Sequence, residues 1–384
     1  MTLVSDVSEE TTAGTDALNS PVAPRPEAVA SSVEEVAGDQ PRTLRVRTVD
    51  EISSLIGSGV GSLGLDWLVY ERLMPWSGVV GFFLCWWILL VGLYAAVTAL
   101  SNPLPVVRDR LAGAVVATGA VIVFAALAWT ILWIFYKGWP ALHHLNFYTD
   151  DMSGVRPTDA LTKGGVRHAV LGSGIEIGIA TLISLPLGVG TAVYLTEVRG
   201  GVTQIVRTVV EAMTALPDIL AGLFVYTVLI IGLHWERTGF AAALALAVTM
   251  VPIIARSAEV VLRVVPSGLR EAGLALGASR WQTVRRVVLP TARSGLATAL
   301  ILGVARIAGE TAPLLIVSGA STFYNSDPFH NPMNSLPLFI FSAVRSGEPL
   351  YIARGFGAAA LLLALVVALF VTTRFLARDK VRGR

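Results

Sequence analysis

The sequence has 384 residues, of which 54% are apolar and only 15% are charged. Ordinary soluble domains carry about 25% charged residues, so this composition indicates a protein embedded in a lipid bilayer. The formal net charge of +2 excludes a nucleic-acid partner, because duplex binding rests on many clustered Lys and Arg side chains. The single cysteine, Cys85, excludes an intrachain disulfide and a cysteine metal cluster, and no bound metal is expected.

The first 50 residues are rich in Glu, Asp, Thr, Ser, Ala and Pro and contain few aromatic residues. Such a segment cannot bury enough apolar surface to offset the entropy of ordering, so we expect a disordered acidic tail over 1–50. Residues 51–111 are predicted to hold a transmembrane helix preceded by a short interfacial helix between Ile52 and Leu73. The remaining apolar stretches lie within 112–377, and a basic tail, 378–384, follows.

Seven stretches are long and apolar enough to span the membrane, since a spanning helix needs about 20 mostly apolar residues. They predict an all-α integral membrane protein. The predicted spans are Gly78 to Leu100, Gly113 to Phe135, Val170 to Leu195, Ile205 to Leu233, Phe240 to Val261, Gly295 to Val317 and Gly355 to Phe375.

The basic residues predict the orientation of these spans. Segment 263–293 contains six arginines and Glu271 as its only acidic residue, and the C-terminal tail is also basic. Short loops rich in Lys and Arg remain in the cytoplasm, so both segments are predicted inside. Alternation then places the loops around Asp150, His234 and Asp327 outside. With seven spans, the acidic N-terminal tail is also predicted outside.

The cytoplasmic segment between Ser267 and Pro290 has a helical pattern. Leu269, Ala272, Gly273 and Leu276 fall on one helix face, and Ser267 is a favourable N-cap residue. Gly277 is expected to end this first helix, and Pro290 to end a second helix before the next span. On periodicity alone, an ordinary amphipathic surface helix is the simpler explanation.

The small residues of this segment, Ala272, Gly273 and Ala275, would allow a partner protein to approach the backbone closely. The chain contains no Gly-x-x-x-x-Gly-Lys-Ser/Thr phosphate loop, so we expect that it does not hydrolyse ATP and is not an enzyme. A transporter without a nucleotide site would receive the work of a separate ATPase through a rigid contact of this kind.

Two sets of motifs resemble known transporters. Glu271-Ala272, followed by Gly277 and by Val288-Leu289-Pro290, resembles the signature cytoplasmic loop of ABC importer permeases. Three further runs resemble the A-type permease subunit of phosphate-specific ABC transporters: Ala215 to Phe224, Val251 to Glu259 and Ala305 to Leu315. The resemblance covers about residues 113–377 and implies a six-helix permease core, from which the acidic tail and the additional first span depart.

The resemblance implies a non-catalytic permease that moves inorganic phosphate into the cell by alternating access, in the plasma (inner) membrane of a bacterium. It implies three kinds of protein partner besides the lipid bilayer: a dimer of ATPase subunits, a second homologous permease and an extracytoplasmic phosphate-binding protein. ATP and Mg would be bound by the ATPase, so no cofactor is expected in this chain. The implied ATPase-coupling residues are Glu271, Ala272, Gly273, Gly277 and Pro290.

Charged residues within the spans are the predicted substrate path. Arg256 and Glu259 are three residues apart and Arg306 and Glu310 are four apart, so each pair can share a helix face. A charge at the centre of a span costs about 2.5 to 3.5 kcal/mol, and an arginine fork suits a phosphate oxyanion. Thr311 completes the predicted path. Alternatively, both pairs only lock helices together, or Arg256 and Glu259 extend to the cytoplasmic interface.

Three alternative functions would require different sequence features. A permease for another oxyanion, such as molybdate or sulfate, would share the same architecture. A secondary transporter or channel would not need the Glu271 to Pro290 segment, and inverted repeats would be expected. A membrane enzyme would need a convergent catalytic constellation, which the sequence does not contain. A further intramembrane acid, Glu176, has no partner that the sequence identifies.

Overall fold

The computed structural model describes residues 49–74, 78–198 and 200–378, and these residues form helices joined by turns and loops without a β-strand. The chain divides into two compact units, Met1–Val121 and Ile122–Arg384. The predicted acidic tail lies almost wholly outside the described residues, as does the basic tail.

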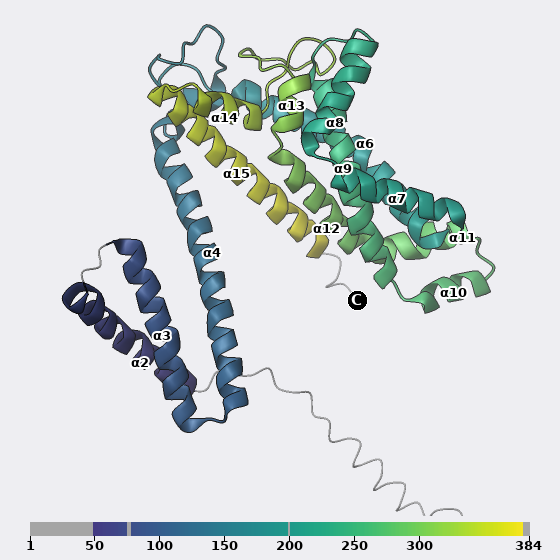
Figure 1. Ribbon diagram of the computed structural model, residues 1–384. Coiled ribbons are helices and arrows are strands. Elements are labelled where there is room, and N and C mark those ends of the chain that lie inside the picture. Colours follow the sequence, from purple (N-terminus) through teal and green to yellow (C-terminus); the bar gives the residue numbers. More distant parts are fainter. Residues whose placement is uncertain (1–48, 75–77, 199, 379–384) are drawn as a thin grey trace, which may run out of the picture. The chain divides into compact units, whose positions relative to one another are not determined.

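The first unit contains a pair of helices packed side by side (Figure 1). Helix α2, Val49–Asp66, continues as a π-helical segment η1, Trp67–Leu73, and α3, Val79–Ser101, follows. The helix predicted between Ile52 and Leu73 is therefore present, and α3 coincides with the predicted first span. The next helix, α4, Leu104–Leu142, begins in this unit and is longer at both ends than predicted.

The second unit is built from long helices and short helices that interrupt them. The long helices are α6, Arg167–Glu197; α9, Gly239–Val264; α12, Leu289–Ala308; and α15, Pro349–Arg378. The short helices are α5, Asn146–Thr149; α7, Gly201–Ala215; α8, Asp218–Val225; η2, Tyr226–Gly232; α10, Ser267–Ala275; α11, Arg280–Thr283; η3, Val284–Val288; α13, Ala312–Val317; and α14, Leu336–Arg345.

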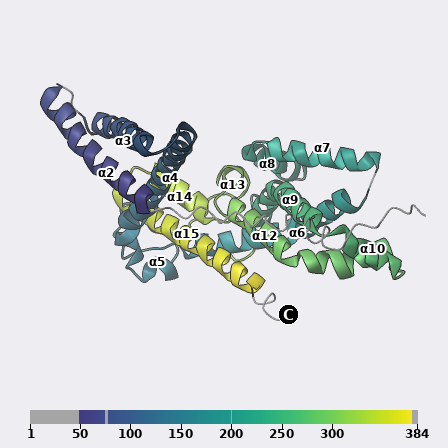
Figure 2. The ribbon, with the colours of Figure 1, turned by 90° about the horizontal axis from the view of Figure 1, so that it is seen from below.

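Helix α9 forms the centre of this unit, with α6 and α12 packed on it (Figures 1 and 2). Its first half is rich in alanine, and those alanines are fully buried together with Leu246, Met250 and Ile254. Small side chains allow neighbouring helices to approach closely, so α9 can be covered on several sides at once. The charges carried by its second half are consequently held at fixed positions.

Six described helices are long and apolar enough to cross a membrane, and a seventh crossing results if α7 and α8–η2 are counted together. The predicted span from Ile205 to Leu233 is not straight, because these two helices meet at an angle of 103°. Leu216 and Pro217 at the bend have extended backbones, with ψ of 133° and 132°. The bend follows from the sequence, because a residue before proline disfavours the helical conformation.

The predicted span from Gly295 to Val317 is displaced along the chain. One helix runs from Arg280 to Ala308, so Pro290 does not end a helix as predicted. The π-helical segment η3 lies directly before Pro290, and the wider turn accommodates the proline ring and its missing N–H. The chain then breaks at 309–311, and α13 begins with Pro313 in its first turn.

Candidate functional site

Three arginines surround the buried carboxylate of Glu259 on α9. Arg207 from α7 and Arg263 from α9 bind its Oε1 at 2.9 and 2.6 Å, and Arg256 lies 3.4 Å from Oε2. The Glu259 side chain is only 4% exposed, whereas that of Arg256 is 42% exposed. A carboxylate this deeply buried is stable only when it is paired, and here it organises guanidinium groups from two helices.

A second carboxylate, that of Glu211 on α7, binds the outer side of Arg256 at 2.9 Å. The Glu259 cluster, which consists of Arg207, Glu211, Arg256, Glu259 and Arg263, therefore holds three cations and two anions. The structure brings the predicted pair Arg256 and Glu259 together. Sequence reasoning missed the other three members, although the four-residue spacing of Arg207 and Glu211 is typical of one charged helix face.

Arg306, near the end of α12, binds two carboxylates. Its Nη2 lies 2.8 Å from Asp218 Oδ2 and 3.3 Å from Glu310 Oε1. Asp218 is the first residue of α8, directly after the bend at Pro217, and Glu310 lies in the break after α12. The predicted pair Arg306 and Glu310 is thus present, and the Arg306 cluster, Arg306 with Asp218 and Glu310, joins two interrupted helices.

The two interrupted helices also pack against each other. A Cβ atom on Gly222 of α8 would lie 2.6 Å from Pro313 Cα of α13, so only glycine permits this approach. Thr311, the remaining residue of the predicted path, is the N-cap of α13, and its carbonyl accepts a hydrogen bond from Leu315 N. Its side chain makes no capping hydrogen bond.

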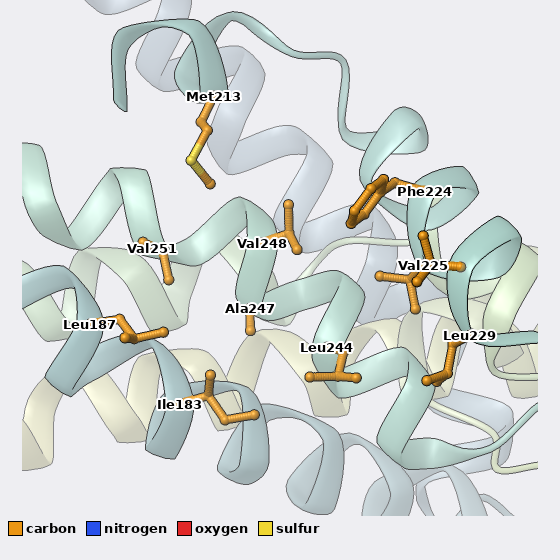
Figure 3. A pocket seen from close by; sticks show the side chains of 11 residues that line it. Ile183, Leu187, Met213, Phe224, Val225, Leu229, Leu244, Ala247, Val248 and Val251 are labelled. Atoms are coloured by element: carbon orange, nitrogen blue, oxygen red, sulfur yellow. The ribbon is translucent and has the colours of Figure 1, made fainter. Parts of the chain in front are cut away.

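Two cavities lie beside the bend, and their linings differ. A cavity of about 190 Å³ is lined by Arg306 and Asp218 together with the hydroxyl residues Thr214 and Thr249. A larger cavity of about 370 Å³ is lined by aliphatic side chains, Met213 and Phe224, which come from α6, α7, α8, η2 and α9 (Figure 3). Apolar walls cannot replace the hydration of an anion, so the smaller cavity is the candidate anion site.

The segment predicted to couple to an ATPase forms two helices joined by a tight turn. Helix α10 begins at Ser267, but Pro266 rather than Ser267 occupies its N-cap. Gly277 has φ of +81°, the left-handed conformation that ends helices, as predicted. Ser279 and Gln282 then form a capping box at the start of the second helix.

The exposed surface of this segment includes large apolar side chains. Leu276 is 89% exposed and Trp281 is 63% exposed, and Glu271 and Ala272 are exposed beside them. Gly273 does not belong to this surface, because a Cβ atom there would lie 3.0 Å from the Thr283 side chain of the second helix. The small size of Gly273 therefore serves packing within the segment, and its role in coupling stays a prediction.

Arg270 fixes α10 to the ends of two long helices. Its guanidinium binds Glu197 of α6 at 3.0 Å and donates to the carbonyls of Leu262 and Val265, each at 2.8 Å. The sequence placed Arg270 only among the cytoplasmic charges. The contacts instead connect the exposed segment rigidly to the packed helices.

Glu176, which the sequence left without a partner, is fully buried on α6. The hydroxyl of Ser318, which follows α13, donates to its Oε1 at 2.9 Å and also contacts the carbonyl of Met333. Glu176 thereby ties α6 to the loop of residues 318–335. Among the described residues no group of three or more His, Cys, Asp or Glu side chains is arranged to hold a metal ion.

Crossing helices, clusters of arginines and carboxylates on them and a packed segment between two crossings define a multi-pass membrane permease. The chain belongs to the family of binding-protein-dependent transport system inner membrane components, whose family model matches residues 184–380. As a member of this family it is a non-catalytic permease of the bacterial plasma membrane.

Curated relatives specify the branch of the family. The phosphate transport system permease protein PstA 1 of Mycobacterium tuberculosis H37Rv is 36% identical over 277 residues, which cover 70% of this chain and 89% of the relative. PstA of Mycobacterium leprae is 35% identical, covering 72% and 92%. PstA of Haemophilus influenzae is 34% identical, covering 66% and 88%.

Solved structures similar to this chain are also ABC transporters. A chain of the MetNI methionine transporter in an inward-facing conformation has a TM-score of 0.43 at 25% identity, covering 56% of this chain and 93% of that chain. A chain of a bacterial alginate importer has a TM-score of 0.46 at 18% identity, covering 67% and 96%.

Proposed function

We propose that the chain is one permease subunit of an ATP-driven importer that moves inorganic phosphate into the cell. The observation that carries the proposal is the position of Arg306, in a chain about a third identical to phosphate permeases. Arg306 lines a small cavity beside the bend, together with Asp218 and two threonines among mainly apolar residues. An arginine fork offers paired hydrogen bonds to an oxyanion, and its charge persists in a dry site.

Asp218 and Glu310 would hold Arg306 when no anion is bound. The side chain of Arg306 is 55% exposed, so its charge can be reached from outside this chain. An incoming phosphate would compete with both carboxylates for the guanidinium, and their repulsion would later help to release it. In this scheme Arg306, Glu310 and Thr311 belong to the substrate path.

The Glu259 cluster would attract the anion at a second level of the path. It contains one more cation than anions, and Arg256 is its half-exposed member. Because Arg256 and Arg306 are both exposed in the isolated chain, a second homologous permease would complete the cavity between the two subunits. An extracytoplasmic phosphate-binding protein would deliver the anion to that cavity.

A dimer of ATPase subunits, which binds ATP and Mg, would dock on the segment from Ser267 to Pro290. Leu276, Trp281, Ala272 and Glu271 form the exposed surface of the segment, and Gly277 sets the turn between its helices. Arg270 would pass the movement of that surface to α6 and α9. Closure of the ATPase would then switch the cavity between outward and inward access.

The test is phosphate uptake into vesicles that contain this chain, its partner permease, the ATPase and the binding protein. Glu271→Arg is expected to abolish uptake. Arg306→Gln is expected to reduce uptake at least ten-fold while the variant still assembles with the ATPase. Glu236→Arg, which reverses an exposed acid after η2, and Arg345→Gln, which removes a cation on α14, are the matched controls and should transport normally.

The outcomes separate the parts of the proposal. Uptake of molybdate or sulfate instead of phosphate would contradict the substrate but retain the architecture. Normal uptake by Arg306→Gln would contradict the anion path alone. Uptake that proceeds without ATP would contradict the ATP-driven mechanism and would favour a secondary transporter.

A further inference from the structure

The helix formed by α2 and η1 has its polar side chains inside and its apolar side chains outside. Ser58, Ser62 and Asp66 are 2%, 0% and 0% exposed, and Tyr70 is also buried. These residues recur every four positions, so they form one stripe along the helix. Stripes of this spacing in water-soluble helices are usually apolar when buried.

The buried stripe faces α3. The phenol of Tyr70 donates to Gly78 O at 3.0 Å and its ring contacts that of Phe82, while the Cys85 thiol lies beside the Asp66 carboxyl. Further along, a Cβ atom on Gly61 would lie 3.2 Å from Leu93 Cδ2. Residues late in α2–η1 therefore contact residues early in α3, and residues earlier in α2 contact residues later in α3. The two helices are antiparallel.

In the middle of the helix, the opposite face contains no polar side chain. Between Leu55 and Leu68 every exposed position is Leu, Ile, Val, Trp or Gly, and Val60 is 71% exposed. If the helix lay in water, its serine and aspartate side chains would face the solvent and its apolar side chains would be buried. The helix shows the opposite arrangement. Hydrocarbon is the solvent that accepts the exposed face and drives the polar stripe against α3.

The helix is also long enough to cross a bilayer. Its two segments have 18 and 7 residues, which gives a length of about 35 Å against a hydrocarbon thickness of about 30 Å. Charged residues lie within its two ends, Asp50 and Glu51 in the first turn and Glu71 and Arg72 in the last, and Asp66 is the only charged residue between them.

We infer that α2–η1 crosses the membrane as the antiparallel partner of α3, with hydrocarbon chains of lipid against the face that carries Ile56, Val60 and Leu63. The interfacial helix predicted from the sequence then becomes a span. This inference does not depend on phosphate being the substrate.

The additional crossing moves the N-terminal tail to the other side of the membrane. Glu197 binds Arg270, so the end of α6 lies on the same side of the membrane as the segment from Ser267 to Pro290, the coupling segment. Counting back through α6, α4, α3 and α2 places residue 49 on that same side. The acidic tail therefore lies on the side where the ATPase would dock, in place of the outer side predicted from seven spans.

Cysteine accessibility tests the placement. The full chain, assembled with its partner subunits in native membranes, carries Cys85→Ala and one introduced cysteine, and a membrane-impermeant maleimide is applied to intact cells and to inverted vesicles. We expect Ser20→Cys to react only in inverted vesicles, together with Gly200→Cys in the exposed turn after α6 and in contrast to Ser326→Cys. A tail cysteine that reacts in intact cells, as Ser326→Cys does, would overturn the crossing.

A spin label tests the solvent of the exposed face. At Val60→Cys we expect relaxation by oxygen to exceed relaxation by a water-soluble nickel complex several-fold, while a label at Gly200→Cys should show the reverse. Relaxation by nickel at position 60 would place the helix in water, and protection from both reagents would show that protein rather than lipid covers it. Either result would contradict the inference.

Discussion

The Glu259 cluster and the Arg306 cluster are opposite solutions to placing charge among apolar helices. In the first, one buried carboxylate gathers three arginines, and in the second, one half-exposed arginine is held by two carboxylates. The buried centre must be neutralised for the helices to pack, whereas the exposed centre can exchange its partners at low cost. The first cluster therefore fixes structure and the second is suited to binding and release.

The largest effect should follow from Glu259→Gln. Removal of the buried carboxylate leaves Arg207 and Arg263 without this partner, while Arg256 keeps Glu211. The stability should fall by about 3 kcal/mol, the lower end for breaking a buried pair, because these arginines are partly solvated. A thermal unfolding curve in detergent measures the loss. Glu211→Gln is the matched control, because this carboxylate is 50% exposed and its loss should cost less than about 1 kcal/mol. Equal losses would show that burial does not distinguish the two carboxylates.

A smaller effect is expected from Gly222→Ala, which overlaps Pro313 where the two interrupted helices meet. Such overpacking costs about 1 to 3 kcal/mol and would separate Asp218 from Arg306. Both unfolding temperature and phosphate uptake should fall. Gly174→Ala is the control, since a Cβ atom there meets no atom within 4 Å and alanine favours the helix. Unchanged uptake by Gly222→Ala would show that the approach of α8 to α13 does not matter for transport.

Asp218→Asn should leave stability nearly unchanged, because the ion pair is partly exposed and is worth about 0 to 1 kcal/mol. It should nevertheless alter transport. With one competitor removed, phosphate should bind Arg306 more tightly, by up to about five-fold, and leave more slowly. Initial uptake rates over a range of phosphate concentrations would show a lower KM and a lower maximal rate. If neither parameter changes, the anion does not contact Arg306.

The smallest effect concerns the loops that follow α5 and α13. Partial burial acts to raise the pKa of Asp151, but hydrogen bonds from Ser153 and Tyr324 outweigh it, and the pKa lies below its ordinary value. Its contribution to stability is therefore complete above the ordinary pKa of about 3.9 and is lost as the pH falls through the folded pKa.

Asp151→Asn should accordingly lower the unfolding temperature at pH 7, and the difference should shrink as the pH falls below about 3.9. Asp150→Asn, which changes a neighbouring exposed carboxyl, serves as the control and should lower the unfolding temperature at pH 7 by less. A difference for Asp151→Asn that persists at acid pH would mean that packing, rather than the ionised carboxylate, joins the two loops.

The sequence predicts what depends on local pattern. Apolar length locates the crossing helices, the four-residue spacing pairs Arg306 with Glu310, and Gly277 marks the turn of the coupling segment. Contacts between distant segments could not be predicted from local patterns. Asp218 and Arg306 are 88 residues apart in the sequence, and Glu176 and Ser318 are 142 residues apart. Pro217 predicts that a helix ends there but does not predict the angle between α7 and α8. The helix continues through Pro290 because a π-helical segment precedes it, and no residue spacing in the sequence predicts that segment.

The uninterrupted helix from Arg280 to Ala308 has a mechanical consequence. Its 29 residues make a rod about 43 Å long, with the capped turn of the coupling segment at one end and Arg306 at the other. A rigid rod cannot tilt at its base without swinging its tip, whereas a helix ended at Pro290 would have bent and absorbed the movement. The helical conformation is interrupted at 309–311, beyond the tip, so a movement applied at the base would displace the guanidinium relative to α13.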